Sequence, residues 1–187
     1  MPGSYYTDPI EFLIHTLIGL YIMAVLIRFL MQWARADFHN PIGQMLIRIT
    51  NPPLMPLRRV IPPWRRFDLA ALALMLLLQI GSLLLIGALR GGLPSFGSLA
   101  ILALAELIAL TLNLFFFTIL IGVILSWVMQ DRYHPVYRLL HQINEPLLGP
   151  LRRLLPPMGG LDLSPLLAII AIHLAKLIML PPLMQMV

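Results

Sequence analysis

The chain has 187 residues, of which 59% are hydrophobic and only 11% charged, and its mean hydropathy is +0.88. This composition is too apolar for one soluble core of that length and indicates a membrane protein. The absence of cysteine excludes disulfides and thiolate metal sites, and a formal net charge of +5 beside apolar segments favours anionic lipid headgroups over nucleic acid as a partner.

Four continuous apolar runs follow one another along the chain, at residues 10–33, 69–89, 99–129 and 163–183. Each exceeds the roughly 20 residues that a helix needs to cross a bilayer. Because the runs do not alternate between apolar and polar residues, they indicate helices rather than barrel strands. No basic residue precedes the first run and no small-residue cleavage site follows it, so we expect a membrane span there and not a removable signal peptide.

The arginines predict how these runs are oriented. Six lie between the first two runs and four between the last two, whereas the opposite side holds only Arg90. By the positive-inside rule, both connectors are expected in the cytoplasm and both termini on the other side. Trp33, Trp64 and Trp127 fall at the same predicted boundary, as an aromatic belt requires.

The two halves of the chain are copies of each other. Adding 94 to a residue number carries Trp33 onto Trp127 and Asp68 onto Asp162 without a gap, and places PLRRVIPP at 56–63 on PLRRLLPP at 150–157. The predicted repeats are therefore 1–93 and 94–187, each with two spans and one connector. An even number of spans per repeat predicts that both copies point the same way, related by a pseudo-two-fold axis along the membrane normal.

Each connector is expected to form two short pieces. The stretch 134–146 has the pattern of an amphipathic helix in the interface plane, and prolines should separate it from the arginine turn that follows. Asp68 and Asp162 precede apolar runs, where their carboxylates are expected to cap the next helix. The predicted fold class is an all-α membrane protein with four transmembrane helices, arranged as two parallel two-helix repeats with cytoplasmic, amphipathic, proline-framed connectors.

The connector arginines have three interpretations. They contact anionic lipid or a partner, they only fix the topology, or they form internal ion pairs in which Arg58 binds Asp68 and Arg152 binds Asp162. The candidate lipid or partner contacts are Arg58, Arg59, Arg65, Arg66, Arg152 and Arg153.

Polar residues inside the spans form a second candidate site, made of Glu106, Asn113, His173 and Lys176. Helix rise places Glu106 and Lys176 at matching depths and predicts an ion pair between them. The four residues then line an ion or proton path, or else the pair is only structural or the lysine extends toward the membrane surface. Arg28 is expected to extend in this way as well. No catalytic motif, cofactor fingerprint or metal-ligand spacing occurs, so we expect no enzyme activity, no cofactor and no bound metal.

The stretch NEPLLGPLRRLLPPMGGLDLSP at 144–165 resembles the signature of the YggT family of small bacterial and plastid membrane proteins, called YlmG in some lineages. A two-span unit occurs there once or twice, and this chain resembles a doubled member. Its first copy departs from the signature, with Asn51 in place of Glu145. The resemblance implies a bacterial inner membrane, with links to osmotic or salt tolerance and ion homeostasis and, among relatives, to cell division, plastid nucleoid distribution and cytochrome b maturation.

Two functions are compatible with these patterns. The first is a non-enzymatic organising or assembly factor, whose partners are anionic membrane lipids, a membrane or cytoplasmic protein, or a second copy of the chain, with no direct contact to nucleic acid. The alternative is an oligomeric channel or transporter subunit for potassium or other ions. Repeated identity is concentrated in the connectors, whereas Glu106 corresponds to Phe12 and Lys176 to Ser82, which favours the first.

Overall fold

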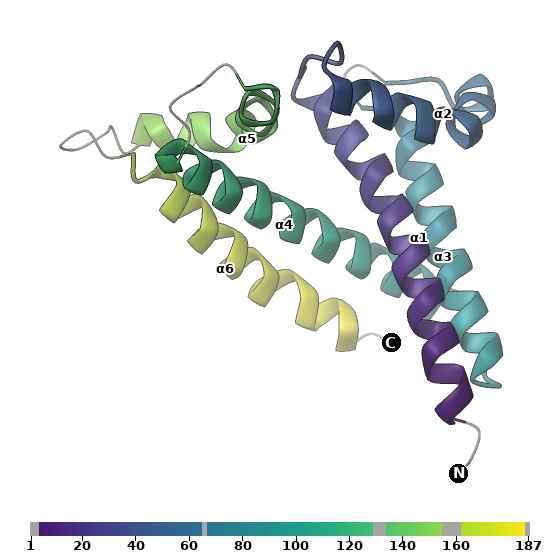
Figure 1. Cartoon of the computed structure of the whole chain (residues 1–187). Helices are drawn as coiled ribbons and strands as arrows, with labels where there is room; N and C mark the ends of the chain where they lie inside the picture. Colours follow the sequence, from purple (N-terminus) through teal and green to yellow (C-terminus); the bar gives the residue numbers. More distant parts are fainter. Residues whose placement is uncertain (1–3, 65–66, 129–133, 155–161, 186–187) are drawn as a thin grey trace.

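The computed structural model describes residues 4–64, 67–128, 134–154 and 162–185, which form six helices (Figure 1). In chain order they are α1 (Ser4–Trp33), α2 (Pro41–Val60), α3 (Leu69–Leu89), α4 (Phe96–Val128), α5 (Pro135–Leu154) and α6 (Ser164–Gln185).

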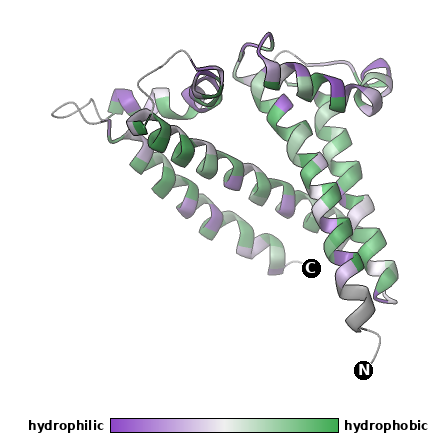
Figure 2. Ribbon diagram, in the orientation of Figure 1, coloured by the Kyte–Doolittle hydropathy of each residue, from purple (hydrophilic) through white to green (hydrophobic). Residues whose placement is uncertain are grey.

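Four of the helices are long and apolar enough to cross a membrane, over Pro9–Trp33, Leu69–Leu89, Phe96–Val128 and Ser164–Gln185. These spans match the four predicted runs, which confirms the all-helical class. At most a third of the most apolar window of each span is buried, and Figure 2 shows hydrophobic residues along all four. In a membrane, the exposed apolar side chains face lipid.

The spans pack as an open row. Helix α3 lies between α1 and α4, and α4 lies between α3 and α6. A two-fold axis would pair α1 with α6 as it pairs α3 with α4, but α3 and α4 pack together whereas α1 and α6 do not, so the expected two-fold arrangement is wrong for this structure. The α3–α4 contact includes a hydrogen bond from Gln79 to Glu106. The symmetric positions hold His173 and Phe12, both exposed, which cannot repeat that bond.

Both connectors lie across one end of the spans, and the two termini lie toward the other end (Figure 1). Each connector is one helix rather than the two pieces expected, because α2 continues through Pro52, Pro53 and Pro56 and α5 through Pro146 and Pro150. A proline inside a helix leaves the carbonyl four residues earlier without its amide partner. For Pro53 that carbonyl is on Ile49, and it accepts a hydrogen bond of 3.2 Å from the Tyr21 hydroxyl of α1 instead.

The inner face of each connector helix closes the core at this end. Leu46 and Leu54 of α2 are buried, as are Leu139, Ile143 and Leu148 of α5. The α2 helix is seated so closely that a Cβ at Gly43 would lie 3.0 Å from the backbone of Phe38. The equivalent residue of α5 is Tyr137, so the second connector does not use this close approach.

Gly87 and Gly91 shape the turn after α3. A Cβ at Gly87 would lie 2.9 Å from the carbonyl oxygen of Gly92, and Gly91 has a φ of +74°, which favours glycine. These two glycines have the spacing of a GxxxG motif, which often packs transmembrane helices together. Here both are explained by the turn at the end of α3.

Candidate functional site at the connector end

The structure divides each arginine pair into one internal and one exposed side chain. Nη2 of Arg58 lies 2.5 Å from Oδ2 of Asp68, and Nε of Arg152 lies 3.0 Å from Oδ2 of Asp162. Arg59 and Arg153 follow directly in the sequence and are exposed. Because consecutive residues of a helix point about 100° apart, one arginine can bind the next span while its neighbour faces outward. The third interpretation of the pairs therefore describes Arg58 and Arg152, but not Arg59 and Arg153.

The two aspartates differ in burial. Asp68 is 1% exposed and forms the N-cap of α3, where its carboxylate accepts a hydrogen bond from the amide of Ala71. Asp162 lies two residues before α6, is exposed, and accepts hydrogen bonds from the amide and hydroxyl of Ser164. Burial raises the pKa of Asp162, but the hydrogen bonds from Ser164 and Arg152 outweigh that effect, so its pKa is lower than usual.

Arg152 also binds a second carboxylate, since its Nη1 lies 2.6 Å from Oε2 of Glu145. Burial lowers the pKa of Arg152, but the hydrogen bonds to Asp162 and Glu145 outweigh that effect. The pKa is therefore raised above its usual value, and the guanidinium stays charged. The first repeat has Asn51 in place of Glu145, and so lacks this second negative charge.

The turn after α1 contacts the second connector directly. The amide of Asp37 donates a hydrogen bond of 3.1 Å to Oε1 of Gln142, and Nη2 of Arg138 lies 3.9 Å from the Asp37 carboxylate. Hydrogen bonds from the amide and side chain of His39 lower the pKa of this carboxyl, which keeps it charged. The two repeats are thus joined at the connector end as well as along the α3–α4 contact.

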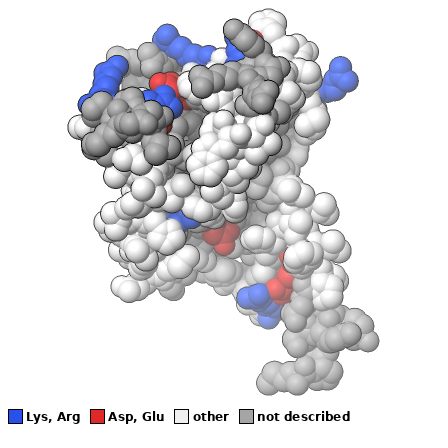
Figure 3. Space-filling view, turned by 60° about the vertical axis from the view of Figure 1, so that its left-hand side comes forward, with Lys and Arg blue, Asp and Glu red and all other residues white. Residues whose placement is uncertain are grey.

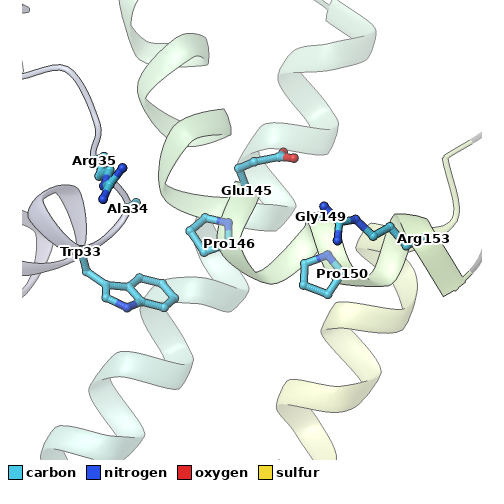
Figure 4. A pocket seen from close by; sticks show the side chains of 8 residues that line it. All are labelled: Trp33, Ala34, Arg35, Glu145, Pro146, Gly149, Pro150 and Arg153. Carbon is cyan, nitrogen blue, oxygen red and sulfur yellow. The ribbon is translucent and has the colours of Figure 1, made fainter. Parts of the chain in front are cut away.

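A cavity of about 420 Å³ lies beside this junction, between the end of α1 and helix α5 (Figure 4). Arg35 and Arg153 approach it from opposite sides, with Glu145 between them and the Trp33 ring at its base. Arg35 has a φ of 55°, a backbone conformation that costs a non-glycine residue roughly 1 kcal/mol. The lining residues are Trp33, Ala34, Arg35, Glu145, Pro146, Gly149, Pro150 and Arg153.

Positive charge is concentrated at this end of the molecule. Figure 3 shows most of the visible lysine and arginine over the connectors, above a largely uncharged span region. Arg35, Arg48, Arg59 and Arg153 are exposed and have no ion-pair partner among the described residues. Arg65 and Arg66, which the sequence also suggests as contacts, lie outside the described residues.

The predicted pair between Glu106 and Lys176 is wrong. Glu106 accepts a hydrogen bond from Gln79 of α3, whereas Nζ of Lys176 lies 2.5 Å from Oδ1 of Asn113 and 5.7 Å from the centre of the Phe116 ring. Helix α4 has 33 residues and is about 50 Å long, so a depth counted from one end of it cannot be matched to a depth counted from the other face of a 30 Å core. His173 is exposed on α6, and the four residues do not line a common cavity among those described at the connector end.

Sequence reasoning missed a buried arginine. Arg28 is 6% exposed, and its Nη1 donates a hydrogen bond of 2.6 Å to Oγ1 of Thr50 in α2, so its guanidinium has a partner within the chain. A signal was present in the register of the duplication, which places Gly122 opposite Arg28 and Asn144 opposite Thr50. Asn144 instead accepts a hydrogen bond of 2.8 Å from Thr118. Within the described residues, no group of three or more His, Cys, Asp or Glu side chains has the geometry of a metal site.

The fold and these contacts define a multi-pass, all-helical protein of two repeats, with four membrane-spanning helices and a basic connector face. The chain belongs to the CCB3/YggT family, which it matches over residues 7–89 and again over 101–183. The two matches start and end 94 residues apart, in the register of the internal duplication.

Relatives in other bacteria align over nearly the whole chain. It is 45% identical to an uncharacterised protein of Pseudomonas aeruginosa over 171 residues, which cover 90% of this chain and 87% of that relative. It is 41% identical to a protein encoded in the proC 3′ region of Vibrio alginolyticus, covering 92% and 94%, and 38% identical to the Escherichia coli protein YggT, covering 91% and 88%. No solved structure matches the chain.

Proposed function

We propose that this protein is a non-enzymatic organising or assembly factor, and that α2 and α5 form a basic face that binds anionic lipid and a protein partner. The division within the arginine pairs supports this role. Arg58 and Arg152 fix each connector to the following span, so that Arg59 and Arg153 are presented on rigid helices. A pair that served only to set topology would need charge but no fixed direction.

The junction between the repeats supports the same proposal. Arg35 and Arg153 come from different repeats and flank one cavity, where both guanidinium groups can contact one anionic group. The bond from Asp37 to Gln142 holds these elements together. We further propose that this face lies in the cytoplasm of a bacterium with the protein in its inner membrane, and that the family's link to osmotic and salt tolerance reflects assembly rather than transport.

Lipid preference tests the proposal. The full chain is reconstituted in vesicles that contain phosphatidylglycerol or only phosphatidylcholine, and lipid enrichment is measured with a labelled phosphatidylglycerol. Each exposed arginine near an anionic surface contributes about 1 kcal/mol, so Arg59→Gln and Arg153→Gln are each expected to weaken the preference about fivefold. Lys176→Gln removes the same charge from inside a span and should leave the preference unchanged.

The alternative, an ion channel or transporter subunit, gives the opposite results in the same vesicles. Potassium flux above that of empty vesicles, altered by Lys176→Gln and not by Arg153→Gln, would support transport and overturn the organising role. Equal lipid enrichment by the original chain and by the arginine variants, without flux, would also overturn it.

A further inference from the structure

A cavity lies within the second repeat. It encloses about 650 Å³ between α4, α5 and α6. Its lining combines apolar side chains of the spans, including Ile119, Val123 and Ile169, with polar groups at the connector end, namely Tyr137, His141, Asn144, Arg152 and Asp162. An apolar base within the span and a polar rim at its end match the shape of a membrane amphiphile.

The first repeat fills the corresponding space with its own side chains. Arg28 occupies the position of Gly122 and reaches across to Thr50, which is fully buried. Met75 and Asp68 are at most 2% exposed, whereas their counterparts differ: Ile169 is half-buried and Asp162 is exposed. The same fold is therefore closed around a guanidinium in one copy and open in the other.

Glycine at position 122 is not required by the backbone. A Cβ there would lie 3.8 Å from Nδ2 of Asn144, an ordinary contact. The missing side chain instead leaves room where the first repeat has an arginine. The packing of the connector helix differs between the repeats as well. Gly43 brings α2 close to Phe38, whereas α5 has Tyr137 at the equivalent position.

The charge of the open site is also different. In the first repeat, Arg28 and Arg58 outnumber Asp68, which leaves one net positive charge. In the second, the charged side chains that line the cavity are Arg152 and Asp162, which pair with each other and leave no net charge when His141 is neutral. The second repeat thus lacks a cation where the first supplies one from its own chain.

We propose that this cavity binds one phospholipid whose headgroup carries a primary ammonium group. The ammonium takes the place of the Arg28 guanidinium near Asp162, the phosphate accepts hydrogen bonds from Asn144 or Tyr137, and an acyl chain lies against the apolar walls. The proposal does not rest on the anionic-lipid role of the exposed arginines, since the site and the preferred headgroup differ.

Native mass spectrometry of the full chain in detergent tests this site with phosphatidylethanolamine, phosphatidylcholine and phosphatidylglycerol. One phosphatidylethanolamine is expected per chain, bound at least about tenfold more tightly than the other two, because only its headgroup combines a positive charge with N–H donors for a carboxylate. Gly122→Arg and Gly122→Met fill the cavity and should each abolish that binding, while the matched variant Gly122→Ala should retain it.

Should Gly122→Arg fail to fold, Gly122→Met still decides, because its flexible apolar side chain needs no polar partner. Binding of phosphatidylethanolamine by Gly122→Met as tightly as by the original chain would overturn the proposal. Equal affinity for all three lipids would overturn the ammonium assignment, and loss of the phosphatidylglycerol preference in vesicles upon Arg153→Gln would leave this site untouched.

Discussion

Loss of Arg58 is expected to destabilise the protein far more than loss of its counterpart Arg152. The Asp68 carboxylate is 2% exposed, so removing Arg58 leaves a buried negative charge without its partner. Breaking a buried ion pair in this way costs about 3 kcal/mol. The Asp162 side chain is 40% exposed and Arg152 is 30% exposed, so water replaces most of what the second pair provides, and Arg152→Met should cost less than about 1 kcal/mol.

Equilibrium unfolding in mixed detergent micelles, followed by far-ultraviolet circular dichroism, measures both free energies. Asp68→Asn removes the charge and keeps an oxygen that can accept the Ala71 amide. The double variant Arg58→Met, Asp68→Asn should therefore be more stable than Arg58→Met alone. Equal losses for Arg58→Met and Arg152→Met, or strictly additive effects in the double variant, would refute the assignment of a buried pair to the first repeat only.

Three further results are expected. Arg35→Gly should raise the free energy of unfolding by about 1 kcal/mol, because glycine adopts a positive φ without strain, while it weakens the phosphatidylglycerol preference of vesicles. The lowered pKa of Asp162 means that its stabilising contribution is present above its unfolded value of about 3.9 and is lost as pH falls through the lower folded pKa, so the melting temperatures of Asp162→Asn and the original chain should converge in acid. The chain has no cysteine, so Gln44→Cys and Ser95→Cys each introduce a single thiol, and an impermeant maleimide should label only Ser95→Cys in intact cells.

The spans and the duplication were predictable because they rest on strong one-dimensional signals. Apolar runs of more than 20 residues have few alternatives to a membrane helix. The helix cap formed by Asp68 was predictable for a similar reason, since it involves only residues close to each other in the sequence. Local signals of this kind do not depend on how the helices pack.

Contacts between spans were not predictable in the same way. Depth along a helix gave Glu106 a partner on α6, but the open row of spans places Gln79 of α3 beside it instead. The continuous connector helices were missed because both helices continue through their internal prolines; at Pro53 the freed Ile49 carbonyl finds another donor in Tyr21, far away in the sequence. Both outcomes depend on tertiary neighbours that no local pattern records.

The duplication provides an internal comparison that neither repeat offers alone. The two repeats align without a gap, so equivalent positions can be compared directly. A difference at one position, such as Arg28 in the first repeat and Gly122 in the second, shows the effect of that side chain on an otherwise similar backbone. In the first repeat, Arg28 and Asp68 are buried and Gly43 brings α2 close to Phe38. The second keeps the same connector and the same ion pair, yet leaves a cavity beside that pair. Because burial favours the closed arrangement and an open apolar cavity is unfavourable when empty, the open copy is the one in which a bound molecule would contribute most to stability.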